Sequence, residues 1–215
     1  IRLLNGKPLV AYIIEAAKAS GAFDAIFINS EDEIFLDIAK EYGVCFYKRP
    51  EYLAYPAATN DQFVTDFLQH VSCFRLIQLL ATSPFLRPET IKGFVQKMSF
   101  TNISAMISVK DIQIECMYQD APVNFDMDQD TQPSQDLTPV QAYACGIMGW
   151  KRDGFFSGDL KSPWRGAYHG FGVPTIYYAL QGFDTVDIDT EQDFLLAEKI
   201  AQTLADKNVP EPCYY

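Results

Sequence analysis

Apolar residues along this chain follow two patterns, a helical period and short continuous runs. The helical period predicts helices over residues 8–20, 31–42, 59–71, 88–98 and 191–204. The short runs predict strands over residues 25–29, 44–47, 74–80, 103–109, 143–150, 174–180 and 185–189. Strands and helices that alternate at this spacing are typical of an α/β domain with a mainly parallel central sheet and helices on both faces.

The alternation breaks between about residues 110 and 140, where the sequence is rich in Asp, Gln and Pro. Such a stretch predicts a hairpin or loop excursion over the sheet. No internal repeat is visible. We therefore expect residues 1–215 to form a single domain, with an excursion over about residues 110–180.

Charge and cysteine content exclude several classes of function. The formal net charge is −11, so the chain has no basic stripe with which to bind a nucleic acid polymer or an anionic membrane. No apolar run is long enough to span a bilayer. The five cysteines are widely spaced, without a Cys-x-x-Cys pair, as expected of reduced thiols in a cytoplasmic protein. With two histidines, a zinc site is disfavoured.

The strongest candidate for chemistry is Asp187-Ile188-Asp189, at the end of an apolar run and just before the last predicted helix. In an extended strand, residues two apart point to the same face, so both carboxylates would lie side by side with Ile188 buried between them. Mg²⁺ is a natural counterion because it takes oxygen ligands and bridges to phosphates. The alternative is a strand end whose acids face water, with Thr190 as the helix N-cap.

Open α/β sheets bind ligands beyond the carboxyl ends of their strands. The loops expected at that edge are residues 30–32, 55–60 and 81–87, together with the acidic pair. Thr82 and Ser83 could contact a ligand through hydroxyl and N–H groups, or they form an ordinary turn. Thr59 and Asn60 precede a helix, where N–H groups bind anions, although simple N-capping is the alternative.

Several short motifs occur in an order that resembles the acylneuraminate cytidylyltransferases over nearly the whole chain. They are residues 4–12, Ser30-Glu31-Asp32, Lys48-Arg49-Pro50, residues 81–84, Gln135-Asp136-Leu137, and residues 186–190 with Asp193. The resemblance implies a Rossmann-like nucleotidyltransferase fold with a small inserted dimerisation lobe, and a homodimer. It also implies an Mg²⁺-dependent reaction that joins CTP to a sialic-acid-like nonulosonic acid and releases pyrophosphate.

The resemblance also assigns roles to residues. It implies that Asp187 and Asp189 hold the metal and serve catalysis. Nucleotide contacts fall on Thr59, Asn60, Thr82 and Ser83, and sugar contacts on Gln135, Tyr143 and Phe171. Gln78 stands two residues before the position where the family often has Gln-Pro, and it would replace that glutamine in the sugar pocket.

Two departures from the family pattern leave alternatives open. The glycine-rich triphosphate loop of the family would precede Ile1, so either it lies upstream of the given sequence or the protein has lost it. Cys145 to Gly149 stand where the family has Asn-Gly-Ala-Ile-Tyr, which changes the sugar pocket. The alternatives are a nucleotidyltransferase for another sugar or base, and a non-catalytic homologue that serves as a binding module.

Overall fold

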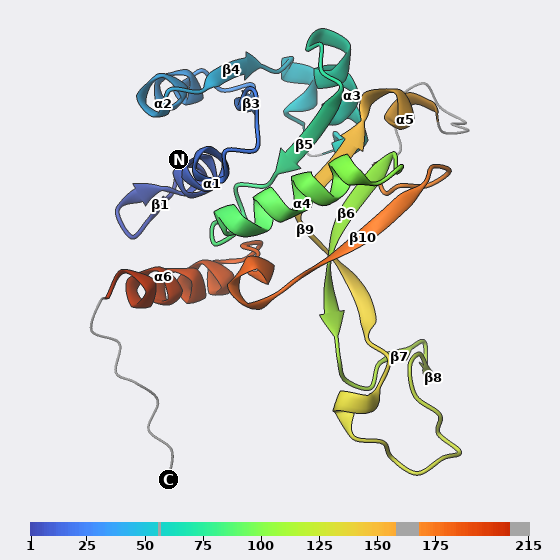
Figure 1. Cartoon of the computed structure of the whole chain (residues 1–215). Helices are drawn as coiled ribbons and strands as arrows, with labels where there is room; N and C mark the ends of the chain where they lie inside the picture. Colours follow the sequence, from blue (N-terminus) through green and yellow to red (C-terminus); the bar gives the residue numbers. More distant parts are fainter. Residues whose placement is uncertain (56, 158–167, 207–215) are drawn as a thin grey trace.

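The centre of the protein is a four-stranded mixed sheet, seen in a computed structural model that describes residues 1–55, 57–157 and 168–206 (Figure 1). Its strand order is β10-β6-β9-β5. The four strands are β5 (Arg75–Leu79), β6 (Ala105–Ile112), β9 (Val140–Lys151) and β10 (Thr175–Leu180). Strand β10 is parallel to β6, while β9 is antiparallel to both of its neighbours. Three of the four strands thus run the same way, as the prediction of a mainly parallel sheet requires.

Helices cover both faces of this sheet, which confirms the predicted layers. Helices α1 (Leu9–Ser20) and α4 (Pro88–Phe100) bury one face in a core that includes Ile13, Phe94 and Ile147. Helices α3 (Asn60–His70) and α5 (Arg152–Ser157) bury the other face, around Trp150. In the described part of the chain, no helix has the length and apolar content that crossing a membrane requires.

A smaller parallel pair, β3 (Phe27–Ser30) and β4 (Cys45–Lys48), lies beside α2 (Ile34–Tyr42). Helix α2 begins three residues later than predicted, and the carboxylate of Asp32 accepts a hydrogen bond from the Ile34 amide at 3.0 Å. A short hairpin of β1 (Leu3–Leu4) and β2 (Lys7–Pro8) precedes α1, and η1 (Glu51–Leu53) is a 3-10 turn before α3.

The excursion predicted near residue 110 is a lobe at the end of a two-stranded arm. Strands β6 and β9 stay paired as far as Ile112 and Val140, beyond the last residues of β5 and β10. The arm carries β7 (Met117–Tyr118), β8 (Ala121–Pro122) and the 3-10 turn η2 (Ser134–Asp136). Figure 1 shows the lobe projecting away from the body of the domain. The prediction that it folds over the sheet is therefore wrong, because the continued ladder carries it outward.

The prediction of a strand over residues 185–189 is also wrong. The chain instead forms the 3-10 turn η3 (Gly182–Thr185), followed by an extended segment that leads into α6 (Glu191–Ala205). The turn begins at Gly182, whose φ of +57° suits glycine. The side chain of Asp184, within this turn, forms an ion pair with Arg87. Ile188 is only half-buried, and its amide donates a hydrogen bond to the Thr82 carbonyl at 2.9 Å.

Candidate functional site

The acidic pair lies against the turn that follows β5. The Oδ1 atom of Asp187 is 3.5 Å from Ser83 Oγ, and the amide of Ile188 binds the carbonyl of Thr82. Asp187 is half-buried and Asp189 is exposed. These contacts bring together four of the predicted site residues, Thr82, Ser83, Asp187 and Asp189, from positions about one hundred residues apart in the chain.

Strand β9 approaches the same turn closely at Gly146. The amide of Leu80 donates to the Gly146 carbonyl at 3.3 Å, and a Cβ atom at Gly146 would lie 3.1 Å from Ser83 Oγ. Glycine at this position lets the strand pack against the buried Ser83. Sequence reasoning did not assign a role to Gly146, although an isolated glycine within an apolar strand is a signal of close backbone approach.

Cys145 faces the acidic pair from the neighbouring position of β9. Burial raises the pKa of its thiol, and the carboxylates of Asp187 and Asp189 raise that pKa further. Both carboxylates therefore act on one point of β9. Cys145 has a φ of +54°, next to a register shift between Ile107 and Val109 in the ladder of β6 and β9. The sequence motif alone did not reveal this irregularity.

Tyr168 interacts electrostatically with Cys145 on β9 and with the start of α3. Its hydroxyl is buried without a hydrogen-bond partner in the described part of the protein. Burial raises the pKa of Tyr168, with smaller contributions from Cys145 and Asp61. Asp61 follows Asn60 in the first turn of α3. The first turn of α3 therefore lies close enough to Tyr168 for the two to interact electrostatically.

Thr59 has the capping role that was the alternative to a ligand contact. Its hydroxyl accepts from the Gln62 amide at 3.3 Å, and the Gln62 side chain accepts from the Thr59 amide at 2.8 Å. This capping box occupies the Thr59 side chain. Asn60 is exposed at the first position of the helix. Neither residue has a described hydrogen bond to the acidic pair, so a nucleotide contact there stays a prediction.

The predicted sugar-binding residues are more scattered. Gln78 lies on β5, and its Oε1 atom is buried without a partner among the described residues. The Tyr143 ring packs against His169 at 5.2 Å and Tyr177 at 6.1 Å between centroids. Phe171 is 82% exposed, and Gln135 lies in the lobe, where its carbonyl accepts from Gln113. No described contact joins these side chains to Asp187 or Asp189.

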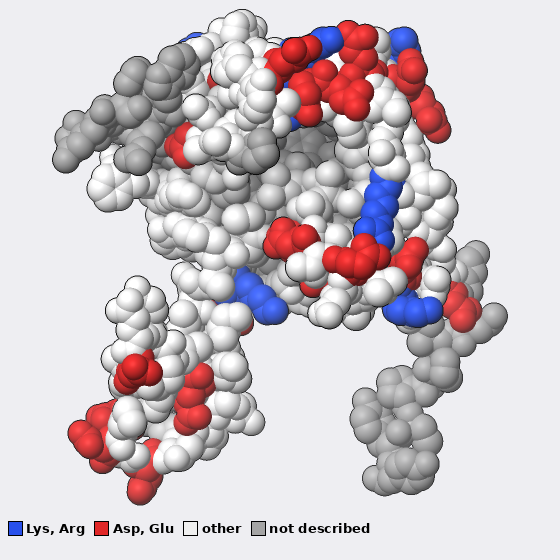
Figure 2. All heavy atoms as spheres, turned by 180° about the vertical axis from the view of Figure 1, so that it is seen from behind, with Lys and Arg blue, Asp and Glu red and all other residues white. Residues whose placement is uncertain are grey.

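Two cationic side chains that could have bound phosphate already form ion pairs with carboxylates. The Nζ atom of Lys7 lies 2.6 Å from Glu15 and over the Tyr12 ring, and Arg87 forms an ion pair with Asp184 at 2.8 Å. Figure 2 shows acidic side chains gathered over α2 and β4 and on the lobe, with few basic ones between. A polyphosphate bound at this face would therefore need a counterion from outside the protein.

A divalent cation is the counterion that the acidic pair can help to hold. Among the described residues there is no group of three or more His, Cys, Asp or Glu side chains that could bind a metal by themselves. Two carboxylates are nevertheless a common protein contribution to Mg²⁺, which keeps several waters and takes further oxygens from substrate phosphates. The donor chemistry thus fits a magnesium ion shared with a bound phosphate.

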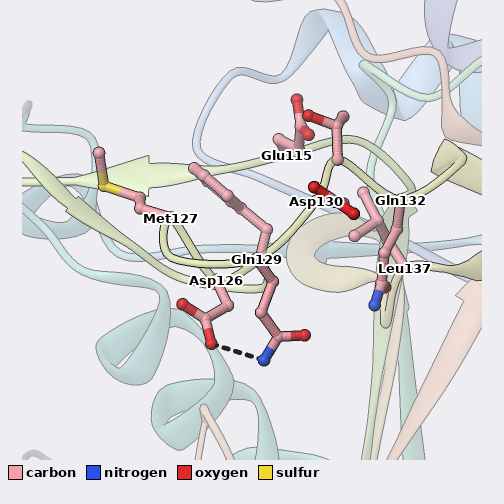
Figure 3. A pocket seen from close by; sticks show the side chains of 9 residues that line it. Glu115, Asp126, Met127, Gln129, Asp130, Gln132 and Leu137 are labelled. Carbon is pink, nitrogen blue, oxygen red and sulfur yellow. Dashed lines mark hydrogen bonds between the residues drawn. The ribbon is translucent and has the colours of Figure 1, made fainter.

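A pocket of about 360 Å³ lies in the lobe and is separate from the acidic pair. Figure 3 shows Glu115, Asp126 and Asp130 around it, with the Gln129 side chain donating to Asp126 at 2.8 Å. None of the predicted site residues lines this pocket.

Comparisons with known proteins agree on one family. The family model described as cytidylyltransferase matches residues 1–142. The chain is 28% identical to an N-acylneuraminate cytidylyltransferase of Escherichia coli O18:K1:H7, over 93% of this chain and 47% of that protein. It therefore spans about half the length of that relative. It is also 28% identical to a CMP-N,N'-diacetyllegionaminic acid synthase of Legionella pneumophila, over 94% of this chain and 88% of that protein.

A solved structure supports the fold. The CMP:2-keto-3-deoxy-manno-octonic acid synthetase complexed with CTP aligns with a TM-score of 0.67, over 94% of this chain and 91% of that chain. Sequence identity in that alignment is 14%, so the likeness concerns the fold alone. It confirms the predicted nucleotidyltransferase type of α/β fold.

The proximity of Cys145 to the two carboxylates predicts how fast its thiol reacts. In Asp187→Asn, loss of a negative charge should lower the pKa of Cys145 and increase the thiolate fraction at pH 8. Iodoacetamide, which is uncharged, should then alkylate Cys145 about two- to threefold faster, as followed by mass spectrometry of its peptide. Asp37→Asn, an exposed change on α2, is the control. Equal rates in all three proteins would show that the carboxylates do not face the thiol.

Proposed function

The chain belongs to the cytidylyltransferase family, and on that premise we propose that it transfers the cytidylyl group of CTP to a sialic-acid-like nonulosonic acid. The single observation that carries the proposal is the convergence of Asp187 with Ser83, beside the extended segment that ends at Asp189. Similarity to the N-acylneuraminate and N,N'-diacetyllegionaminic acid relatives supports the class of sugar. Pyrophosphate is the second product.

We further propose that Asp187 and Asp189 hold Mg²⁺ together with phosphate oxygens of CTP. Asp187 suits this role because Ser83 Oγ and the Ile188 amide, at 3.5 and 3.2 Å, restrain its Oδ1 atom. Asp189 is exposed and free to turn toward a bound ion. When bound, the ion would supply positive charge that offsets the charge on the phosphates and on departing pyrophosphate.

The reaction is a displacement at the α-phosphorus of CTP. The anomeric hydroxyl oxygen of the sugar forms the new bond to that phosphorus and its proton passes to solvent, while the bond from phosphorus to the bridging oxygen of pyrophosphate breaks. The protein contributes mainly by positioning and by exclusion of water. Thr82 and Ser83, fixed by Gly146 and by the Leu80 carbonyl, form the rigid wall beside the reacting groups.

In this proposal, the sugar lies between the body of the domain and the aromatic group of Tyr143, Tyr177 and His169. The buried oxygen of Gln78 and the hydroxyl of Tyr168, both without described partners, are polar groups that a hydroxylated ligand could satisfy. Gln135 lies in the lobe and Phe171 is exposed, so in the proposed homodimer both would be available to a second subunit.

The substrate proposal is tested by release of pyrophosphate from each of the four nucleoside triphosphates, with a panel of nonulosonic acids. We expect release with CTP and at least one such acid, and none after removal of divalent cations with EDTA. Release with another nucleotide or with a sugar phosphate would move the protein to a different nucleotidyltransferase reaction. No release under any condition would favour a binding module.

The metal proposal predicts a specific loss of rate in Asp189→Asn. The substitution keeps the shape of the side chain and removes its charge, so turnover should fall at least about one-hundredfold. The melting temperature should not change, because Asp189 is exposed. Asp37→Asn on α2 is the matched control. Near-normal formation of the CMP-sugar by Asp189→Asn would refute the metal role.

The homodimer proposal places the interface on the lobe, where large apolar side chains are exposed. They are Ile114, Met117, Tyr118, Val123 and Met127. Sedimentation should show a dimer for the wild-type chain and a monomer for Tyr118→Asp, because a charge in an apolar interface is strongly unfavourable. Phe100→Asp, at an exposed apolar residue at the end of α4, should remain dimeric. A wild-type monomer at all concentrations would contradict the proposal.

A further inference from the structure

Asp184 is a buried carboxylate at the centre of a hydrogen-bond network that joins two distant parts of the chain. Its relative exposure is 2%, and it lies in the 3-10 turn η3. Its Oδ1 atom accepts from the Arg87 amide at 2.9 Å and from Arg87 Nε at 3.2 Å. Its Oδ2 atom accepts from Arg87 Nε at 3.2 Å, Arg87 Nη2 at 2.8 Å and Thr90 Oγ1 at 2.7 Å. Both oxygens are therefore satisfied, as burial of a carboxylate requires.

The donors come from the start of α4, which directly continues the turn that contains Thr82 and Ser83. Arg87 is the N-cap residue of α4, and Thr90 lies in its first turn. The arginine donates from its amide as well as its guanidinium, so the position of the backbone itself is fixed relative to Asp184. This dual use distinguishes the contact from an exposed ion pair between two flexible side chains.

Three contacts join residues 82–90 to residues 184–188. Asp184 binds the start of α4, the Ile188 amide binds the Thr82 carbonyl, and Asp187 approaches Ser83. Asp184 precedes Asp187 by three residues, and its contact is the only one of the three made by a fully buried charged group. It determines the register in which the acidic pair reaches the turn.

The other end of the acidic segment is held by local hydrogen bonds at the start of α6, and Glu191 in that turn forms an ion pair with Arg2 at 2.5 Å. Asp193 accepts from the Asp189 amide at 3.3 Å and from the Thr190 amide at 2.8 Å. These bonds fix the start of α6 relative to the acidic pair. They do not connect the pair to α4, so among the described hydrogen bonds the link between this segment and α4 is the one made by Asp184.

We propose that Asp184 is a positioning residue that holds Asp187 and Asp189 at the Thr82-Ser83 turn through Arg87 and Thr90. It does not touch the substrate. Its carboxylate is enclosed by the three groups of Arg87 and by Thr90, and it acts through the segment that it anchors. The inference rests on the proposed function insofar as the positioned carboxylates bind a metal with CTP.

The test compares Asp184→Asn and Thr90→Val with wild-type protein. Thr90→Val removes one donor to Asp184 and keeps the size of the side chain. Thr101→Val is the matched control, because Thr101 also lies at an end of α4 but donates to the Lys97 carbonyl and not to Asp184. If Asp184→Asn fails to fold, Thr90→Val still tests the proposal.

The first measurement needs no ligand. Amide hydrogen exchange at Ile188, which donates to Thr82, should become at least about fivefold faster in Asp184→Asn and Thr90→Val. Exchange in the middle of α6 should not change, and Thr101→Val should match the wild type throughout. Wild-type exchange at Ile188 in both variants would overturn the anchoring role.

The second measurement separates positioning of a metal site from general stability. Binding of Mn²⁺ in the presence of CTP, followed by electron paramagnetic resonance, should weaken about tenfold in both variants. The apparent activation constant for Mg²⁺ should rise, and excess Mg²⁺ should restore much of the turnover in Thr90→Val. Unchanged Mn²⁺ affinity together with a lower melting temperature would reduce Asp184 to a structural role and overturn the proposal.

The two measurements also distinguish failure of this inference from failure of the proposed function. If the wild-type chain releases no pyrophosphate and binds no Mn²⁺ with CTP, the proposed function is wrong. Faster exchange at Ile188 in the variants would then still support the anchor itself. If the wild type is active and the variants match it in every readout, only the positioning role is wrong.

Discussion

The contact between residues 82–90 and residues 184–188 is the interaction on which the candidate site depends. It joins the turn after β5, one edge strand of the sheet, to the segment that follows β10, the opposite edge strand. The buried Asp184 carboxylate fixes one end of this contact, and the Ile188 amide fixes the middle. Because a buried charge tolerates few alternative partners, the geometry of the acidic pair is tightly specified.

The antiparallel strand β9 shapes the other side of the site. Gly146 permits close approach to Ser83, and Cys145, which has a left-handed backbone, has its pKa raised by burial and by both carboxylates. The same strand continues with β6 into the projecting lobe. One strand thus connects the wall of the site to the surface proposed for dimerisation.

Electrostatics and donor chemistry support a metal-assisted reaction. The chain carries a formal net charge of −11, and the nearby Arg87 and Lys7 are paired with carboxylates. A nucleotide with several negative charges would be repelled unless a cation accompanied it. In the proposed reaction, the acidic pair would supply some of the oxygen ligands of that cation and the substrate phosphates would supply others.

The sequence by itself determined the layered α/β fold and the family, and it singled out Asp187 and Asp189 as candidate metal ligands. Apolar periodicity and motif order are patterns in the sequence itself, so one sequence is enough to recognise them. The tertiary structure decided that residues 185–189 form a turn and an extended segment, that the lobe points outward, and that Thr59 is occupied as a cap. It also revealed Asp184, Gly146 and Tyr168. Their roles depend on partners many residues away, and no local pattern encodes which distant donors will satisfy a buried polar group.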